Sequence, residues 1–236
     1  MLTSKFTSVL GARSRDDLLR EVLKFARCNG FDLVSTMAVI DSPLAQPSFI
    51  VLHNSPPLYL ETFMNLELAR RDPVMQHCKH HGTPIVWGQQ TYVSADLGER
   101  WEHQAAFGYK AGIAVAMHMP NGRHYFIGLD RDGPLPSHSG ELTRTVADIQ
   151  LFAVFAQEAA LRILLPETDL DLPKLSVREL ECLRWTMEGK TAWELGQILK
   201  ITEQTAARHI NNATQKLGCI NKLQAVLKAL RLGILG

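Results

Sequence analysis

The stretch LSVRELECLRWTMEGKTAWELGQILKITEQTAARHINNATQKLG, residues 175–218, decides the fold of the C-terminal part of the chain. It contains two capping boxes, Ser176-Val-Arg-Glu179 and Thr191-Ala-Trp-Glu194, in which a hydroxyl and a carboxylate each satisfy a free backbone N–H at a helix start. Gly189 ends the first helix, and Thr202 caps a third. The spacing therefore predicts three short helices, and a fourth begins at Asn221.

Two short helices joined by a tight turn, the second with a polar outer face, are typical of a helix-turn-helix. In the second helix, Leu195, Ile198 and Leu199 are expected to face inward. In the third, the expected buried positions are Ala206, Ile210, Ala213 and Leu217. The outer face of the third helix carries side chains able to hydrogen-bond base edges or phosphates: Gln204, Thr205, Arg208, Asn211, Asn212 and Gln215. A structural helical bundle has the same periodicity, so the pattern alone leaves both interpretations open.

The same stretch resembles the DNA-binding domain of LuxR-type regulators, with Glu179, Leu183 and Gly189 on that family's most characteristic positions. The resemblance implies a four-helix domain whose third helix reads DNA and whose fourth helps to dimerise. We therefore expect a homodimer that binds a two-fold symmetric operator of double-stranded DNA. The expected DNA contacts are Lys190, Thr202, Gln204, Thr205, Arg208, His209, Asn211, Asn212 and Lys216. The family usually has a polar or basic residue where Ala207 stands, which leaves the preferred DNA sequence open.

The first 165 residues mix helices with strands, which predicts an α+β fold. Ser14 caps a helix that ends at Asn29-Gly30. Further helices are expected from Pro56-Pro57 to Arg70, where Asp72-Pro73 ends the segment, and from Ser137 to Leu164. The apolar runs 35–40, 48–53, 112–119 and 124–130 indicate strands, and Asn121-Gly122 between the last two predicts an antiparallel hairpin.

Three segments follow from these patterns: a domain over residues 1–165, a polar, proline-bounded linker over 166–174, and a helix-turn-helix domain over 175–236. The formal net charge of +1 is unevenly distributed, because residues 175–236 carry +4 and the remainder −3. A small basic module is consistent with a polyanionic partner.

The N-terminal domain resembles the autoinducer-binding domain of quorum-sensing LuxR-type receptors. The matching residues are Asn54–Tyr59, Phe63, Ala69–Pro73, Trp87 and Gly108–Gly112. The resemblance implies an α-β-α sandwich around a five-stranded antiparallel sheet, with N-acyl homoserine lactones as ligands. It places Asp72 where the family's aspartate accepts the ligand amide N–H. From the residues alone, an exposed Asp-Pro turn is the simpler interpretation of Asp72. The ligand-binding residues expected here are Asp72, Tyr59, Phe63, Trp87, Ser55, Trp101, Phe126 and Gly128.

The neighbours of Asp72 depart from the family. Tyr59 replaces a tryptophan, Phe63 replaces a tyrosine, Ser55 stands where several members have a tyrosine, and Gly128 lies near a usual serine or threonine. Each lost ligand hydrogen bond costs about 0.5–1.5 kcal/mol, and an unpaired buried carbonyl about 1–3 kcal/mol. We therefore expect an altered ligand, a weakly bound one, or a regulator that works without one.

Other function classes find little support in the sequence. No nucleophile elbow or phosphate loop occurs, so an enzyme is not expected. His77, Cys78, His80 and His81 are close together but match no known metal-site spacing, and a solvated polar turn explains them better. Four scattered cysteines, no signal peptide and no long apolar run indicate a cytoplasmic protein. Neither a metal nor a cofactor is expected apart from the small-molecule ligand.

Overall fold

The computed structural model describes residues 4–42, 45–63, 70–165 and 173–235, and at residues 42, 45–46, 61–63 and 121 it describes the backbone alone. The chain divides into two compact units, Met1–Glu167 and Thr168–Gly236. Each unit has its own buried core.

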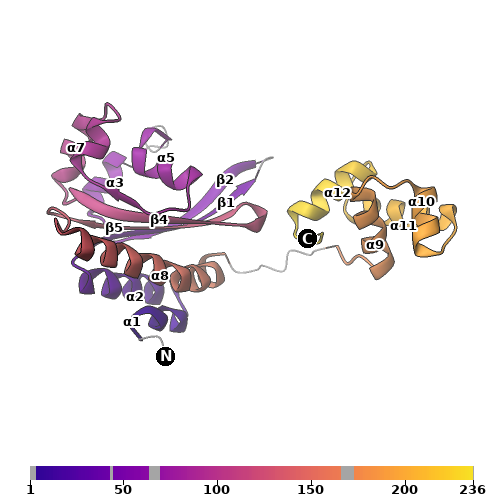
Figure 1. Cartoon of the computed structure of the whole chain (residues 1–236), viewed down its shortest axis with the longest axis horizontal. Helices are drawn as coiled ribbons and strands as arrows, with labels where there is room; N and C mark the ends of the chain where they lie inside the picture. Colours follow the sequence, from indigo (N-terminus) through magenta and orange to yellow (C-terminus); the bar gives the residue numbers. More distant parts are fainter. Residues whose placement is uncertain (1–3, 43–44, 64–69, 166–172, 236) are drawn as a thin grey trace. The chain divides into compact units, whose positions relative to one another are not determined.

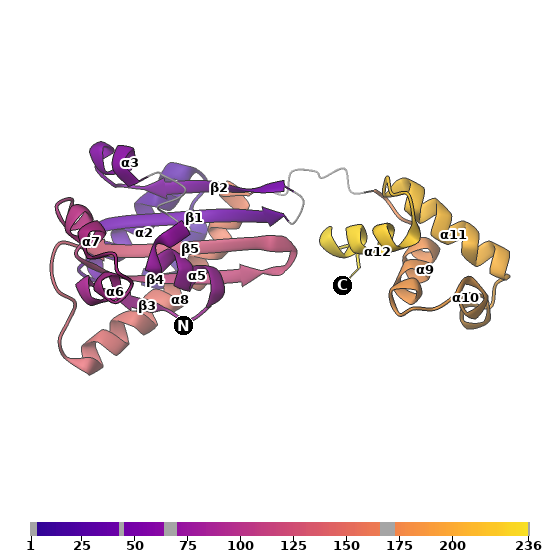
Figure 2. The ribbon, with the colours of Figure 1, turned by 90° about the horizontal axis from the view of Figure 1, so that it is seen from above.

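The first unit is built on a five-stranded sheet in the order β2-β1-β5-β4-β3, with every neighbouring pair antiparallel (Figure 2). The strands are β1 (Leu33–Ser42), β2 (Ala45–His53), β3 (Ile85–Trp87), β4 (Ala111–Met119) and β5 (Arg123–Arg131). The predicted hairpin joins β4 to β5 through a short 3₁₀ turn, Pro120–Gly122. The five-stranded antiparallel sheet expected from the resemblance is therefore confirmed.

Helices cover both faces of this sheet (Figure 1). On one face lie α1 (Ser4–Thr7), the 3₁₀ helix η1 (Ser8–Gly11), α2 (Arg15–Cys28) and α8 (Ser139–Leu164). On the other lie α3 (Pro57–Phe63), α5 (Pro73–His80), α6 (Gln89–Val93) and α7 (Gly98–Ala105). The α+β sandwich is thus as the sequence predicts, although the short elements β3, α6 and α7 give no clear periodic signal.

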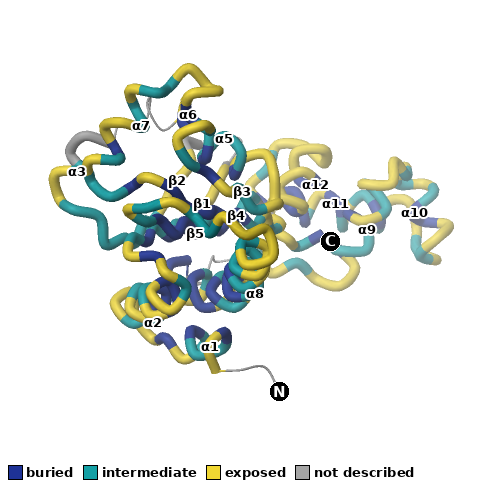
Figure 3. Tube along the Cα trace, turned by 60° about the vertical axis from the view of Figure 1, so that its left-hand side comes forward, coloured by how far each residue is buried: buried dark blue, intermediate teal, exposed yellow. Residues whose placement is uncertain are grey.

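Alternation along the strands sends side chains to two separate cores, one on each face of the sheet. Tyr125, Ile127 and Leu129 of β5 join the core beneath α2 and α8, where Phe25 stacks on Phe152 with ring centroids 3.9 Å apart. The intervening residues of β5 face the opposite side, toward α3 and α5–α7. Figure 3 shows this buried central layer between exposed outer turns.

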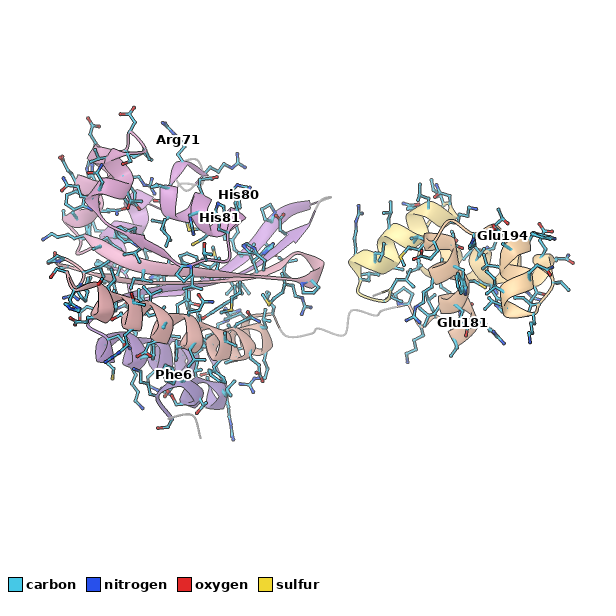
Figure 4. The ribbon with its side chains drawn as sticks, viewed as in Figure 1. Phe6, Arg71, His80, His81, Glu181 and Glu194 are labelled. Atoms are coloured by element: carbon cyan, nitrogen blue, oxygen red, sulfur yellow. The ribbon has the colours of Figure 1, made fainter. Side chains whose placement is uncertain are left out.

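The second unit contains α9 (Val177–Met187), α10 (Ala192–Leu199), α11 (Glu203–Lys216) and α12 (Lys222–Arg231). Both predicted capping boxes are present, and Thr202 and Asn221 cap the last two helices. All four expected inward positions of α11 are buried. Glu194, labelled in Figure 4, accepts the Thr191 backbone N–H at 2.8 Å at the start of α10.

Three expectations need correction. Asp72-Pro73 begins a helix as well as ending one, because the Asp72 carboxylate caps α5 and proline is favoured in a first helical turn. His77, Cys78 and His80 therefore lie on a helix and not in a polar turn, with His81 as its C-cap (Figure 4). Ile198 is 40% exposed, whereas the buried residues of α10 are Leu195 and Gly196. The predicted helix 56–70 is seen from Pro57 to Phe63, and residues 64–69 lie outside the described part.

A buried carboxylate ties α9 to α11. Glu179 is 3% exposed and its Oε2 accepts the Ser176 backbone N–H at 2.7 Å and the Lys216 ammonium at 2.8 Å. Burial alone would raise the pKa of Glu179, but Lys216 and the Ser176 N–H outweigh it and hold that pKa below its usual value.

We expect Lys216→Met to loosen this packing, because it leaves a buried carboxylate without its cation. The expected loss is about 1–3 kcal/mol, against under about 0.5 kcal/mol for Arg178→Met, whose ion pair with Glu181 is on the surface. Hydrogen exchange of the α9 and α11 amides in the whole chain measures both. Equal losses for the two variants would contradict the role assigned to Glu179.

Candidate ligand pocket and DNA-reading helix

A cavity of about 220 Å³ lies in the first unit, between the open face of the sheet and helices α3 and α5–α7. Its apolar lining comes mainly from the sheet and from α5, and several polar side chains converge on it. Residues around the cavity are Ser35, Met37, Val51, His53, Ser55, Tyr59, Leu60, Asp72, Val74, Met75, Trp87, Tyr92, Arg100, Gln104, Tyr109, Ala114, Phe126, Gly128 and Asp130. A mostly apolar hollow with a few polar groups is the usual form of a small-molecule site.

Asp72 is the centre of the polar side of the cavity and is 6% exposed. Its Oδ1 accepts the backbone N–H groups of Val74 and Met75, each at 3.0 Å. Its Oδ2 accepts the Tyr92 hydroxyl at 3.0 Å and the Arg100 Nε–H at 3.2 Å. Four donors from α5, α6 and α7 therefore surround one carboxylate, and the ion pair with Arg100 balances its charge.

Asp130 is a second buried carboxyl group, at the end of β5. Burial raises its pKa to about 8, against the opposing effect of the Trp87 indole N–H, which donates to it. The carboxyl is therefore protonated at neutral pH and retains an O–H donor. It packs over Gly112 of β4, where a Cβ atom would lie 2.6 Å from Trp87 Nε1 and 2.7 Å from the Leu129 carbonyl oxygen. Only glycine leaves room for this arrangement.

Aromatic rings form another wall. Tyr59 stacks on Tyr109 with ring centroids 4.1 Å apart and planes 14° apart. The Tyr109 hydroxyl donates to Ser55 Oγ at 2.7 Å. The imidazole of His53 accepts the Ser55 backbone N–H at Nδ1, at 3.2 Å. Burial raises the pKa of both Tyr59 and Tyr109, so these phenols remain neutral donors and acceptors.

The cavity brings together six of the eight residues expected to bind a ligand: Ser55, Tyr59, Asp72, Trp87, Phe126 and Gly128. Trp101 is not among the lining residues; its indole N–H donates to the Lys110 carbonyl oxygen at 2.9 Å. Phe63 lies at the end of α3, and its side chain is outside the described part.

Sequence reasoning missed Tyr92, Arg100, Gln104 and Asp130 as lining residues. Asp130 had a usable signal, because Phe126, Gly128 and Asp130 alternate along one strand and share a face. Arg100 and Gln104 are one helical turn apart, which puts them on one face of α7. No sequence pattern placed that short helix over the sheet, so its direction was decided by tertiary packing.

The expected DNA-binding residues gather on and around α11. Gln204, Arg208 and Asn211 are exposed on its outer face, while Thr205, His209 and Asn212 are half-buried. Thr202 accepts the Thr205 backbone N–H at 3.1 Å, and the two hydroxyls lie 2.8 Å apart. These bonds fix the N-terminus of the helix, where backbone N–H groups favour phosphate.

Two lysines that were expected to contact DNA form ion pairs with glutamates of the same unit. Lys190 Nζ lies 3.4 Å from Glu194 Oε1, and Lys216 pairs with Glu179. Both side chains remain more than 40% exposed. They therefore contribute positive charge near α10 and α11 while stabilising the helix starts.

In the part of the chain that the structure describes, no three histidine, cysteine or acidic side chains gather as a metal site would require. His77 Nε2 instead lies 2.8 Å from the Thr83 carbonyl oxygen. Among the same residues, no helix has the length and apolar character needed to cross a bilayer.

Comparison with known families identifies the class. Residues 14–160 match the family described as "Autoinducer binding domain", and residues 173–229 match "Bacterial regulatory proteins, luxR family". The chain therefore belongs to the LuxR-type, quorum-sensing transcriptional regulators, which are DNA-binding proteins and not enzymes.

Individual relatives match over nearly the whole chain. Transcriptional activator protein AnoR of Acinetobacter nosocomialis is 28% identical, over 97% of this chain and 96% of its own. SolR of Ralstonia solanacearum is 29% identical, over 95% and 94%. Among solved structures, Escherichia coli SdiA has a TM-score of 0.71 at 25% identity, covering 97% of this chain and 94% of SdiA. A structure of SdiA with octanoyl-rac-glycerol has a TM-score of 0.70 at 26% identity, over 96% and 93%.

Because the pKa of Asp130 is raised in the folded protein, the free energy of unfolding should depend on pH. Between the unfolded value near 3.8 and the folded value of about 8, the folded chain holds a proton that the unfolded chain has released. Stability is therefore lost as pH rises through this window, by about 2 kcal/mol between pH 6 and pH 8. Urea unfolding at pH 6, 7 and 8 should show this fall in the wild type and a flatter profile in Asp130→Asn.

The matched control is Asp132→Asn, because the Asp132 side chain is 61% exposed. It should retain the wild-type slope. Parallel profiles for the wild type and Asp130→Asn would show that Asp130 does not titrate in this range.

The close packing over Gly112 gives another expectation. Gly112→Ala should destabilise the first unit by about 1–3 kcal/mol, because the new methyl group must displace Trp87, Asp130 or the β5 backbone. Gly11→Ala is the control, since an added Cβ there meets no atom within 4 Å. Thermal unfolding of both variants measures the difference, and a stable Gly112→Ala protein would refute the packing argument.

Proposed function

We propose that this regulator is controlled by a small molecule bound in the cavity around Asp72, and that it binds its operator as a homodimer. The observation that carries the proposal is the cavity itself. It lies in the autoinducer-binding domain of a chain that also carries a LuxR-type helix-turn-helix. Ligand binding to the folded state stabilises it by linkage, which couples ligand concentration to the amount of active protein.

The domain boundaries proposed are residues 1–165 for ligand binding and dimerisation, 166–174 for a linker, and 175–236 for DNA binding. The division into compact units between residues 167 and 168 supports them. Binding to chromosomal DNA requires the bacterial cytoplasm, which is where we propose that the protein acts.

An exposed apolar stripe supports dimerisation through α12. Ile220 is 90% exposed, Leu223 66%, Leu227 44% and Leu230 37%. These positions recur at helical spacing, so they share one face. A contiguous apolar face on a small domain is typical of a protein interface, and pairing about a two-fold axis would match a symmetric operator.

For DNA contact we propose α11 as the reading helix. Gln204, Arg208 and Asn211 are exposed polar residues on its outer face and are suited to base edges, with Thr202, Thr205, His209 and Asn212 beside them. Lys190, in the turn before α10, supplies phosphate contact. For Lys216 we propose a structural role first, since its ammonium is paired with Glu179.

The ligand proposed is an acyl-homoserine-lactone-like compound or a related non-lactone. SdiA, similar in fold, has been solved with octanoyl-rac-glycerol, an acyl glycerol. A second candidate is a regulator that works as apo-protein, and it is favoured by Asp72, whose oxygens are satisfied by groups of the protein itself.

The DNA-binding part is tested by selecting preferred sites from a random duplex pool with the full chain, followed by anisotropy titrations. Arg208→Ala should weaken DNA binding. The slope of log K against log salt concentration should fall by about 1, because one cationic contact to the DNA is lost. Asn211→Ala should reduce discrimination at one base pair by about 1–3 kcal/mol. Arg144→Ala, exposed on α8, is the control, and equal losses in all three variants would exclude α11 as the reading helix.

The ligand part is tested by melting temperatures with a panel of acyl-homoserine lactones and octanoyl glycerol. A shift of several degrees at micromolar ligand supports ligand control. No shift, with tight operator binding by the ligand-free protein, would instead support the apo-active regulator.

A further inference from the structure

The hydrogen-bonding groups around the cavity restrict the chemistry of the ligand head. Asp72 offers the obvious acceptor for a ligand N–H, but its two oxygens already accept four protein donors at 3.0–3.2 Å. A carboxylate with two oxygens has about four acceptor positions. A ligand amide reaching Asp72 would therefore have to displace a backbone N–H, Tyr92 or Arg100.

Donors, in contrast, remain available in the lining. Gln104 is 3% exposed, and its side chain interacts with the Tyr92 hydroxyl. Its Nε2 carries two N–H donors and makes no close hydrogen bond among the described residues, so at least one donor remains for a ligand. Ser55 Oγ accepts the Tyr109 hydroxyl, which leaves the proton of Ser55 for another acceptor. Asp130, protonated at neutral pH, adds a third O–H donor. Buried donors without acceptors cost free energy, so a ligand that supplies carbonyl oxygens gains from all three.

The charges in the lining exclude a carboxylate head. Asp72 is balanced by Arg100, and Asp130 is neutral. His53 Nδ1 accepts the Ser55 backbone N–H, so this nitrogen is not a donor to a ligand. A ligand carboxylate would therefore bring one uncompensated charge into a buried, largely apolar cavity, which is strongly unfavourable.

We propose that this pocket selects small uncharged carbonyl compounds without an N–H donor, such as short-chain acyl esters, over the corresponding amides. Gln104 and Ser55 are assigned as donors to the ligand carbonyl groups. Arg100 is assigned as the positioning residue that keeps Asp72 occupied, and so determines the preference. This inference rests on the proposed ligand function of the same cavity.

The test uses two ligands that differ by one group: N-hexanoyl homoserine lactone and O-hexanoyl α-hydroxy-γ-butyrolactone, in which an ester oxygen replaces the amide N–H. Hexanoyl chains suit a cavity of about 220 Å³. Dissociation constants are measured by calorimetry on the full chain at pH 7, with hexanoate as a charged comparison. The ester is expected to bind roughly tenfold more tightly than the amide, because an unaccepted buried N–H is lost. Hexanoate is expected to bind more weakly than either.

Variants assign the preference to residues. Gln104→Leu should weaken ester binding about tenfold, while Gln90→Leu, exposed on α6, should leave it unchanged. Arg100→Met should shift the ratio toward the amide, because it vacates one acceptor position on Asp72. Arg71→Met, the same change at an exposed arginine, should not (Figure 4).

A wild-type ester preference below about threefold, or a preference for the amide, would overturn this inference and leave the proposed ligand function standing. Binding of neither ligand would overturn both. If Arg100→Met fails to fold, the ratio of amide to ester dissociation constants in the wild type and the ester affinity of Gln104→Leu still test the inference.

Discussion

The Asp72 carboxylate is the interaction on which the pocket side of the first unit depends. Its two oxygens bind the first turn of α5, the Tyr92 hydroxyl of α6 and the Arg100 guanidinium of α7. A buried charge is tolerated only when it is paired and hydrogen-bonded, so the positions of three short helices are linked through one side chain. None of these helices is long enough to be stable alone, and their order above the sheet follows from this shared carboxylate and the apolar cluster around it.

The second unit uses the same physical arrangement at Glu179. There too a carboxylate accepts a backbone N–H at a helix start and pairs with a cation from a helix distant in sequence. The result is a rigid scaffold in which α11 is held at both ends: by its threonine cap and by Lys216. The exposed outer face of α11 is therefore presented on a helix whose two ends are fixed.

The two faces of the sheet in the first unit differ in how closely they are packed, and this difference creates the cavity. The face beneath α2 and α8 is closely packed with large apolar side chains and gives the unit its stability. The opposite face carries Gly112, Ala114 and Gly128, whose small size leaves space below α5–α7. The cavity thereby combines an apolar floor with a polar side on which the charge of Asp72 is balanced by Arg100.

The sequence by itself determined the helix-turn-helix, since capping boxes, Gly189 and the 3.6-residue period are local signals, and each of its predicted helix starts is found in the structure. It also determined the long helix α8 and the β4–β5 hairpin, and the family resemblance located Asp72. Only the tertiary structure decided which side chains surround that aspartate. Tyr92, Arg100 and Asp130 are 20, 28 and 58 residues away along the chain. They belong to short elements with weak periodicity, and only the folding of those elements over the sheet shows that Asp72 is saturated by protein donors.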